Sequence, residues 1–177
     1  AIEIECSVNN QCSNSIKGNR FSNNTAIIKG GAVYYNMNRP EFSENQFVNN
    51  SAQYGPNIAS YAVKIVSNDT VINKISIDNV ASGLTHEEPL VFKLVDYDNQ
   101  VMNLDSQSTI KINPITSNVS VSGTDYAKLE EGIAVFDNLV FEAKAGYQNA
   151  KYNLKSNGID DQIITEVFEN NLNNIDS

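Results

Sequence analysis

Few side chains in this chain are suited to covalent chemistry, and the clearest of them are two cysteines. Cys6 and Cys12 are the only cysteines in the 177 residues, and there is one histidine. A zinc site is therefore not predicted, because structural zinc needs four Cys or His ligands in recognisable spacings. The prediction is a local disulfide, which would fit an oxidising compartment. Two free, partly buried thiols are the alternative.

Four Asn-x-Ser/Thr triplets are candidate acceptors for N-linked glycans. They begin at Asn23, Asn49, Asn68 and Asn118. Triplets of this kind also arise by chance in a chain as rich in asparagine as this one. We nevertheless predict occupancy, because Asn23 and Asn49 each precede an asparagine expected to point inward, and period-two alternation then turns them outward. Asn68 lies in a predicted turn between two domains.

A cluster of acidic side chains could ligate calcium. Asp96, Asp98, Asn99 and Asp105 lie close together in the sequence. Their spacing matches no EF-hand loop, which needs a glycine at its sixth position. An ordinary hairpin turn uses the same residue types, and we favour that interpretation. His86 lies in a polar loop without a nucleophile nearby, so we predict no metal, no cofactor and no catalytic residue.

A repeat between residues 16 and 64 carries two of these candidates, Asn23 and Asn49. A shift of 26 residues superimposes Phe21 on Phe47, Asn24 on Asn50 and Ala26 on Ala52. Self-similarity at a fixed period marks units that bury an apolar face by stacking on their neighbours. The pattern predicts about two coils of a short parallel β-helix, with stacked phenylalanines inside and an asparagine ladder at a turn. Ordinary hairpins in an Asn-rich chain are the alternative.

The motif F-x-x-N-x-A, followed by Gly30-Gly31-Ala32-Val33, resembles the right-handed β-helix repeats of polymorphic outer-membrane-type surface proteins. The resemblance implies a solenoid and a surface location. The second copy departs from it, because Pro56-Asn57-Ile58 stands where Gly-Gly-Ala is expected, which indicates a last coil. Many β-helix proteins cleave polysaccharides with carboxylates gathered on one face. Two short coils with scattered charges offer no such site, so an enzyme is not predicted.

From residue 71 the pattern changes to short strands separated by Gly, Asp and Asn, which is typical of a β-sandwich. Strands are predicted at 72–77, 90–95, 109–115, 118–122, 133–141 and 151–155, and residues 125–131 could form one turn of helix. The expected domains are a β-helix stub with an N-terminal cap (1–64), the sandwich (65–156) and an acidic end (157–177). The end carries five acidic residues and no Lys or Arg. A linker, a mobile tail and a strand at 162–168 exchanged with another subunit all remain open.

The sandwich region resembles the immunoglobulin-like repeats of intimin/invasin-type surface proteins. The resemblance rests on residues 90–101 (LVFKLVDYDNQV), on G-x-A-x-F-x-x-L from Gly132, and on Gly146 followed by Tyr152-x-Leu154. It implies an immunoglobulin-like fold and no chemistry. Together with the Asn-rich coils, the arrangement is similar to large surface proteins of ciliate-like protists.

The net charge and the hydropathy argue against two kinds of partner, nucleic acid and a membrane that the chain would span. The formal net charge is −9, which argues against nucleic acid as a partner. No apolar run is long enough to span a membrane. The chain begins abruptly with AIEIEC, without a signal peptide, so we expect a processed protein or a piece of a longer one.

The predicted function is structural: a glycosylated, non-enzymatic subunit or repeat of an extracellular filament or cell-surface coat. Its partners would be N-linked glycans and copies of itself, joined head to tail through β edges, because two coils leave unpaired backbone groups at their ends. The rival is the stalk fragment of an adhesin, which would bind a protein or glycan through loop tyrosines. Its candidates are Tyr97, Tyr126 and Tyr147.

Overall fold

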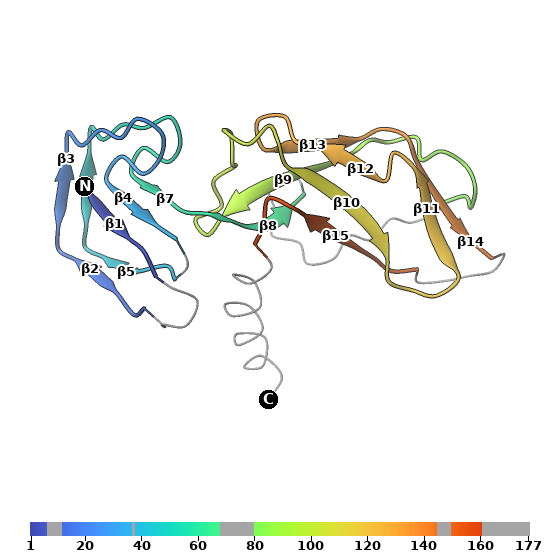
Figure 1. Ribbon diagram of the computed structural model, residues 1–177, viewed down its shortest axis with the longest axis horizontal. Helices are drawn as coiled ribbons and strands as arrows, with labels where there is room; N and C mark the ends of the chain where they lie inside the picture. The colour runs from blue at the N-terminus through green and yellow to red at the C-terminus, as the bar shows by residue number, and fades with distance from the viewer. Residues whose placement is uncertain (7–11, 37, 68–79, 145–149, 161–177) are drawn as a thin grey trace. The chain divides into compact units, whose positions relative to one another are not determined.

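The computed structural model describes residues 1–6, 12–36, 38–67, 80–144 and 150–160. Within these residues the structure consists of strands and turns without any helix, so the predicted all-β class is confirmed (Figure 1). Asn68 and Tyr147 lie outside the described residues, as do the strands predicted at 72–77 and 162–168.

The described chain divides into two compact units. The first contains Ala1–Lys64 and Val95–Leu104, and the second contains Ile65–Leu94 and Asp105–Gly158. Residues 95–104, which the sequence analysis placed inside the sandwich, thus belong with the repeat region. This segment is held to the repeats by hydrogen bonds from Tyr54 to Asp96 and from Tyr35 to Asp98.

The described residues of the first unit form seven short strands in three parallel sheets (Figure 1). One sheet has the order β1-β4-β7, with β1 at Ile2–Ile4, β4 at Val33–Tyr35 and β7 at Ile58–Ala59. The second pairs β2 (Ser15–Lys17) with β5 (Glu41–Ser43), and the third pairs β3 (Arg20–Ser22) with β6 (Gln46–Val48). The first repeat (residues 15–35) therefore contributes β2, β3 and β4, and the second repeat (residues 41–59) contributes β5, β6 and β7.

The register of two of these sheets has the 26-residue offset of the sequence repeat. Ile16 pairs with Phe42, and Phe21 pairs with Phe47. In β2 and in β3 only the central residue is buried, as alternation along a three-residue strand requires. The rings of Phe21 and Phe47 stack with their centroids 5.2 Å apart and their planes 9° apart, which confirms the predicted stack.

The offset changes to 25 residues in the third sheet, where Val33 pairs with Ile58. The change falls between the bridges Thr25↔Ser51 and Lys29↔Tyr54, so the first repeat holds one extra residue there. This residue is accommodated by a loop that leaves Ile27 85% and Ile28 58% exposed. The predicted alignment of Pro56-Asn57-Ile58 with Gly-Gly-Ala is therefore wrong by one residue.

The corrected alignment places Gly30 beside Gly55, and both have positive φ, at 68° and 56°. Such a φ is strained for residues with a Cβ. Gly31 is needed for a different reason, because a Cβ there would collide with the carbonyl oxygens of Pro56 and Ser51. The close approach of the two repeats therefore depends on glycine at these positions.

The remaining described strands lie mostly in the second unit and are antiparallel in every pairing whose register is described (Figure 1). One sheet has the order β12-β10-β15, another pairs β11 with β14, and a third has the order β13-β9-β8. Their bounds are β8 Ala62–Val66, β9 Leu90–Asp96, β10 Thr109–Pro114, β11 Val119–Gly123, β12 Tyr126–Lys128, β13 Ile133–Phe136, β14 Leu139–Ala143 and β15 Tyr152–Ser156. Phe92 and Phe136 form an edge-to-face pair in its core, 5.6 Å apart.

Two local expectations about this unit need correction. Residues 125–131 contain β12 rather than a helical turn, because Ala127 pairs with Ile110 and is buried. The strand predicted at 133–141 is divided into β13 and β14 by Asp137 and Asn138, both exposed. Local propensity is a weak signal where a cross-strand partner buries the side chain.

Candidate functional site

Two asparagine ladders join the repeats. The N–H of Asn24 donates to Oδ1 of Asn50 over 3.0 Å, and Nδ2 of Asn50 donates to the carbonyl oxygen of Phe21 over 3.1 Å. A side-chain bond from Nδ2 of Asn24 to Oδ1 of Asn50, also 3.0 Å, completes the predicted ladder. A second ladder, between Asn19 and Asn45 at the same offset, was not predicted.

In this second ladder the N–H of Asn19 donates to Oδ1 of Asn45 over 3.0 Å, while Nδ2 of Asn45 donates to the carbonyl oxygen of Ile16. The two ladders have one geometry: an asparagine of the second repeat holds an N–H and a C=O of the first. Its amide side chain thus satisfies turn groups that the short strands leave unpaired. In both ladders the asparagine side chain of the second repeat binds backbone groups of the first repeat.

The predicted glycan acceptors that the structure describes are exposed: Asn23, Asn49 and Asn118. All three have positive φ, at 53°, 52° and 61°. Asparagine is among the few residues with a side chain that adopt this conformation readily, so each position also has a backbone reason to be Asn. The hydroxyls of Thr25 and Ser51, which complete two of the triplets, lie 3.1 Å apart at the surface.

The cluster around Asp96 is a structural anchor in the described residues. Asp96 is fully buried. Its Oδ1 accepts the N–H groups of Asp98 and Gln100, both at 2.9 Å. Its Oδ2 accepts the Tyr54 hydroxyl at 2.6 Å and Nε2 of Gln100 at 3.0 Å. Both oxygens are occupied, so this carboxylate binds protein donors, as the favoured turn interpretation predicts.

Asp98 makes a second connection between the 95–104 loop and the repeats. It accepts the Tyr35 hydroxyl at 2.7 Å, and the guanidinium of Arg39 binds its other oxygen through Nε at 2.8 Å and Nη2 at 2.7 Å. Burial, reinforced by the bond to Asp98, raises the pKa of Tyr35. Burial and the bond to Asp96 raise the pKa of Tyr54 in the same way. Both tyrosines are therefore protonated donors at neutral pH.

This network was not predicted from the sequence. Tyr35 and Tyr54 lie far from residues 96 and 98 in the sequence, and tyrosines in a repeat are ordinary core residues. The third acid of the predicted cluster, Asp105, does not join the network. It accepts the N–H groups of Gln107 and Ser108, and these bonds, with the Ser108 hydroxyl, lower its pKa although burial opposes the shift.

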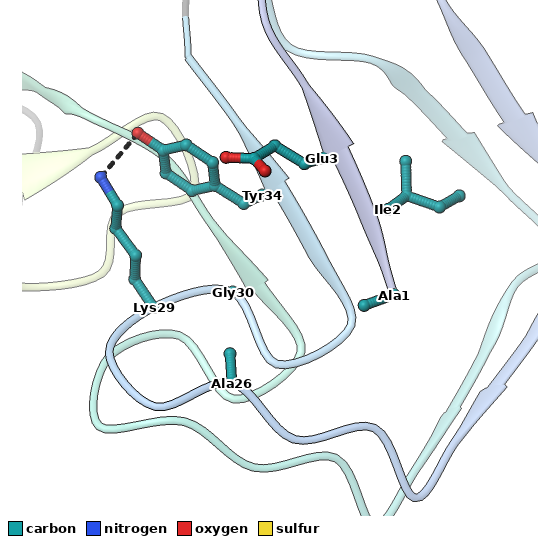
Figure 2. Close-up of a pocket in the computed structure, with 7 residues that line it drawn as sticks. All are labelled: Ala1, Ile2, Glu3, Ala26, Lys29, Gly30 and Tyr34. Atoms are coloured by element: carbon teal, nitrogen blue, oxygen red, sulfur yellow. Dashed lines mark hydrogen bonds between the residues drawn. The ribbon is translucent and has the colours of Figure 1, made fainter.

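Figure 2 shows a pocket of about 350 Å³ in the first unit. Its polar lining includes Glu3, Lys29 and Tyr34. The Lys29 ammonium donates to the Tyr34 hydroxyl over 2.7 Å and also lies over the ring of Tyr61, 4.8 Å from its centroid. Burial and the neighbouring Tyr61 raise the pKa of Tyr34. The pocket thus places a lysine ammonium among aromatic rings.

The remaining predicted residues are located as follows. Cys6 and Cys12 form the predicted disulfide, which is confirmed. Of the adhesin candidates, Tyr126 is 62% exposed, whereas Tyr97 is half-buried against Tyr35 and burial raises its pKa to about 12. His86 packs edge-to-face on Phe141.

The described residues contain no group of three or more His, Cys, Asp or Glu side chains that could hold a metal ion. No helix in that part of the chain is long and apolar enough to cross a membrane. No protein-family model matches the chain, and the searches of curated proteins and of solved structures also returned no significant match.

Proposed function

We propose that the chain is a non-enzymatic structural subunit or repeat of an extracellular filament or cell-surface coat. In this proposal the first unit is a parallel β-helix stub, the second is an immunoglobulin-like sandwich, and copies join head to tail through β edges. The resemblances noted in the sequence support both assignments. The disulfide between Cys6 and Cys12 is consistent with an oxidising, extracellular location.

The observation that carries the proposal is the incomplete stacking of the first unit. β4 has a strand on each side, whereas β2 and β3 each have one partner among the described strands. An unpaired parallel edge presents N–H and C=O groups to another chain. Repeat arrays bury their faces by stacking about three or more units or by capping their ends, and in this proposal neighbouring copies extend the stack of the two described repeats.

Opposite charges on the two repeats favour a directional contact. The exposed cations Lys17 and Arg20 belong to the first repeat, and the exposed anions Glu41 and Glu44 belong to the second. Inside the chain, Lys17 and Glu44 lie 3.9 Å apart across one step of the stack. A contact that joins one end of a copy to the other end of the next does not close, and it therefore generates a filament.

Glycans on the outside would restrict the contact to the ends. We expect the native protein to lose mass when N-linked glycans are removed enzymatically, and expect single changes of Asn23, Asn49 and Asn118 to Gln each to abolish one attachment. A bulky sugar at exposed positions blocks lateral association, so removal should also cause bundling. Mass spectrometry and electron microscopy check the two parts. An unchanged mass would exclude the glycoprotein.

The adhesin alternative is less well supported. It needs exposed aromatic side chains in sandwich loops, and only Tyr126 of the described candidates is largely exposed. Tyr97 is engaged with Tyr35 in the first unit. An adhesin stalk would be monomeric at all concentrations, whereas the proposed subunit stays assembled on dilution.

A further inference from the structure

β7 is the last strand of the sheet β1-β4-β7, and its outer edge is covered by another part of the chain. The N–H of Val33 in β4 donates to the carbonyl oxygen of Asn57. Backbone groups alternate in direction along a parallel strand, so the carbonyl group of Ile58 points away from β4. This outward oxygen accepts Nε2 of Gln100 over 2.9 Å. Residues 95–104 therefore occupy a place that a further strand would need.

The same loop reaches a second outward carbonyl group of the repeat. Tyr54 directs both of its backbone groups toward the first repeat, because its N–H donates to Ile28 and its carbonyl oxygen accepts the N–H of Gly30. The carbonyl group of Gln53, one residue earlier, faces the other way by alternation. Nδ2 of Asn103 lies 3.5 Å from this oxygen. The loop thus follows the outer side of the second repeat up to β7.

A buried carboxylate and an apolar contact hold the loop in this place. Nε2 of Gln100 also donates to Oδ2 of Asp96 over 3.0 Å, the same oxygen that accepts the Tyr54 hydroxyl. This bond orients the amide group toward β7. Met102 packs against the buried cluster that contains Tyr54 and Ala59. All of these residues belong to the first unit and lie in the interior of the chain.

We propose that residues 95–104 are an edge cap, a segment that covers the outer edge of β7 and prevents another strand from adding there. An uncovered edge offers N–H and C=O groups to any extended chain, and a covering loop is one way in which proteins prevent this pairing. The cap goes beyond the proposed function, because it closes this edge whether or not copies assemble through other edges. Contacts between copies would then lie away from β7.

Opening the cap in the full-length chain tests this inference. Gln100→Glu with Met102→Glu replaces the donor to Ile58 by a carboxylate beside Asp96, and sets a second charge against the apolar cluster. Amide hydrogen exchange at residues 98 and 100 should become about tenfold faster, because their N–H groups lose the Asp96 carboxylate as partner. Sedimentation velocity should show a mean mass about twofold above that of wild type at the same concentration, because the uncovered edge gains a partner.

Three further variants make the test specific. Gln100→Met removes only the donor, and should shift both readouts in the same direction by less. Adding Ile58→Pro to the opened variant should return the mean mass to the wild-type value, because proline has no N–H for a strand to bind. The matched control is Asn99→Gly, in the same turn at a φ of 61°, which glycine adopts freely. It should change neither readout.

The possible outcomes are clear. A wild-type mean mass despite faster exchange, or a higher mass that Ile58→Pro does not reverse, would show that the loop does not guard this edge. Unchanged exchange at residues 98 and 100 would show that the named contacts do not hold the loop, which equally overturns the cap. Circular dichroism checks that each variant is folded. Because every variant is compared with wild type, a monomeric wild type would contradict the proposed function and leave this test intact.

Discussion

Changing Phe21 to alanine is expected to lower the free energy of unfolding by about 3–5 kcal/mol, the usual loss when a buried phenylalanine is removed. The ring is 7% exposed and stacks on Phe47 in the interior shared by the two repeats. Phe47→Ala should cost less, because this ring is half-buried. Urea unfolding, followed by circular dichroism, measures both losses. The control is Ile27→Ala, which removes a side chain that is 85% exposed.

The double variant tests whether the rings act as a pair. Stacked aromatic rings interact by about 0.5–1.5 kcal/mol beyond the area that they bury, so the two losses should not add. A loss below about 1 kcal/mol in both single variants would place the rings at the surface, and the stacked repeats would then be wrong.

The second large effect is expected at Asp96. Changing it to alanine removes the acceptor of two backbone N–H groups, of the Tyr54 hydroxyl and of Gln100. Each buried donor left without a partner costs about 1–3 kcal/mol, so we expect a loss of about 3–5 kcal/mol. Tyr54→Phe, which removes one hydroxyl and leaves Asp96 with its other donors, should cost about 1–3 kcal/mol.

Asp137→Ala is the matched control, because Asp137 is exposed between β13 and β14 and its loss should change stability by less than about 0.5 kcal/mol. Thermal or urea unfolding measures all three variants. If Asp96→Ala is as stable as the control, the 95–104 loop is not anchored to the repeats through this carboxylate.

Features of the fold that follow from the sequence repeat could be predicted, whereas features without a repeated pattern could not. Phe21 and Phe47 are followed at one offset by the identical pairs Asn24/Asn50 and Ala26/Ala52, so the stack and its register could be predicted from the sequence. The change of offset near Ile27 could not be predicted, because the identities stop at Ala26 and Ala52 and an extra exposed residue leaves no pattern. Gly55, which the structure matches to Gly30, was the one available sign.

The attachment of residues 95–104 to the repeats could not be predicted from any repeated pattern. The sequence around Asp96 has the residues of a hairpin turn, and the turn is present, with the Asp98 and Gln100 N–H groups bound to the carboxylate. Its connection to Tyr54 joins residues 42 positions apart. No periodicity encodes such a pair, so the division of the chain into units could not be derived from local composition.

The central claim, a structural subunit that assembles through β edges, is tested most directly by the size of the native protein on dilution. Sedimentation velocity of freshly isolated material, over a thousandfold or similar range of concentration, measures this size without labels. The account predicts particles many times larger than the 19.5 kDa chain that persist at the lowest concentration. A single 19.5 kDa species at the highest concentration would contradict it and would favour the adhesin stalk.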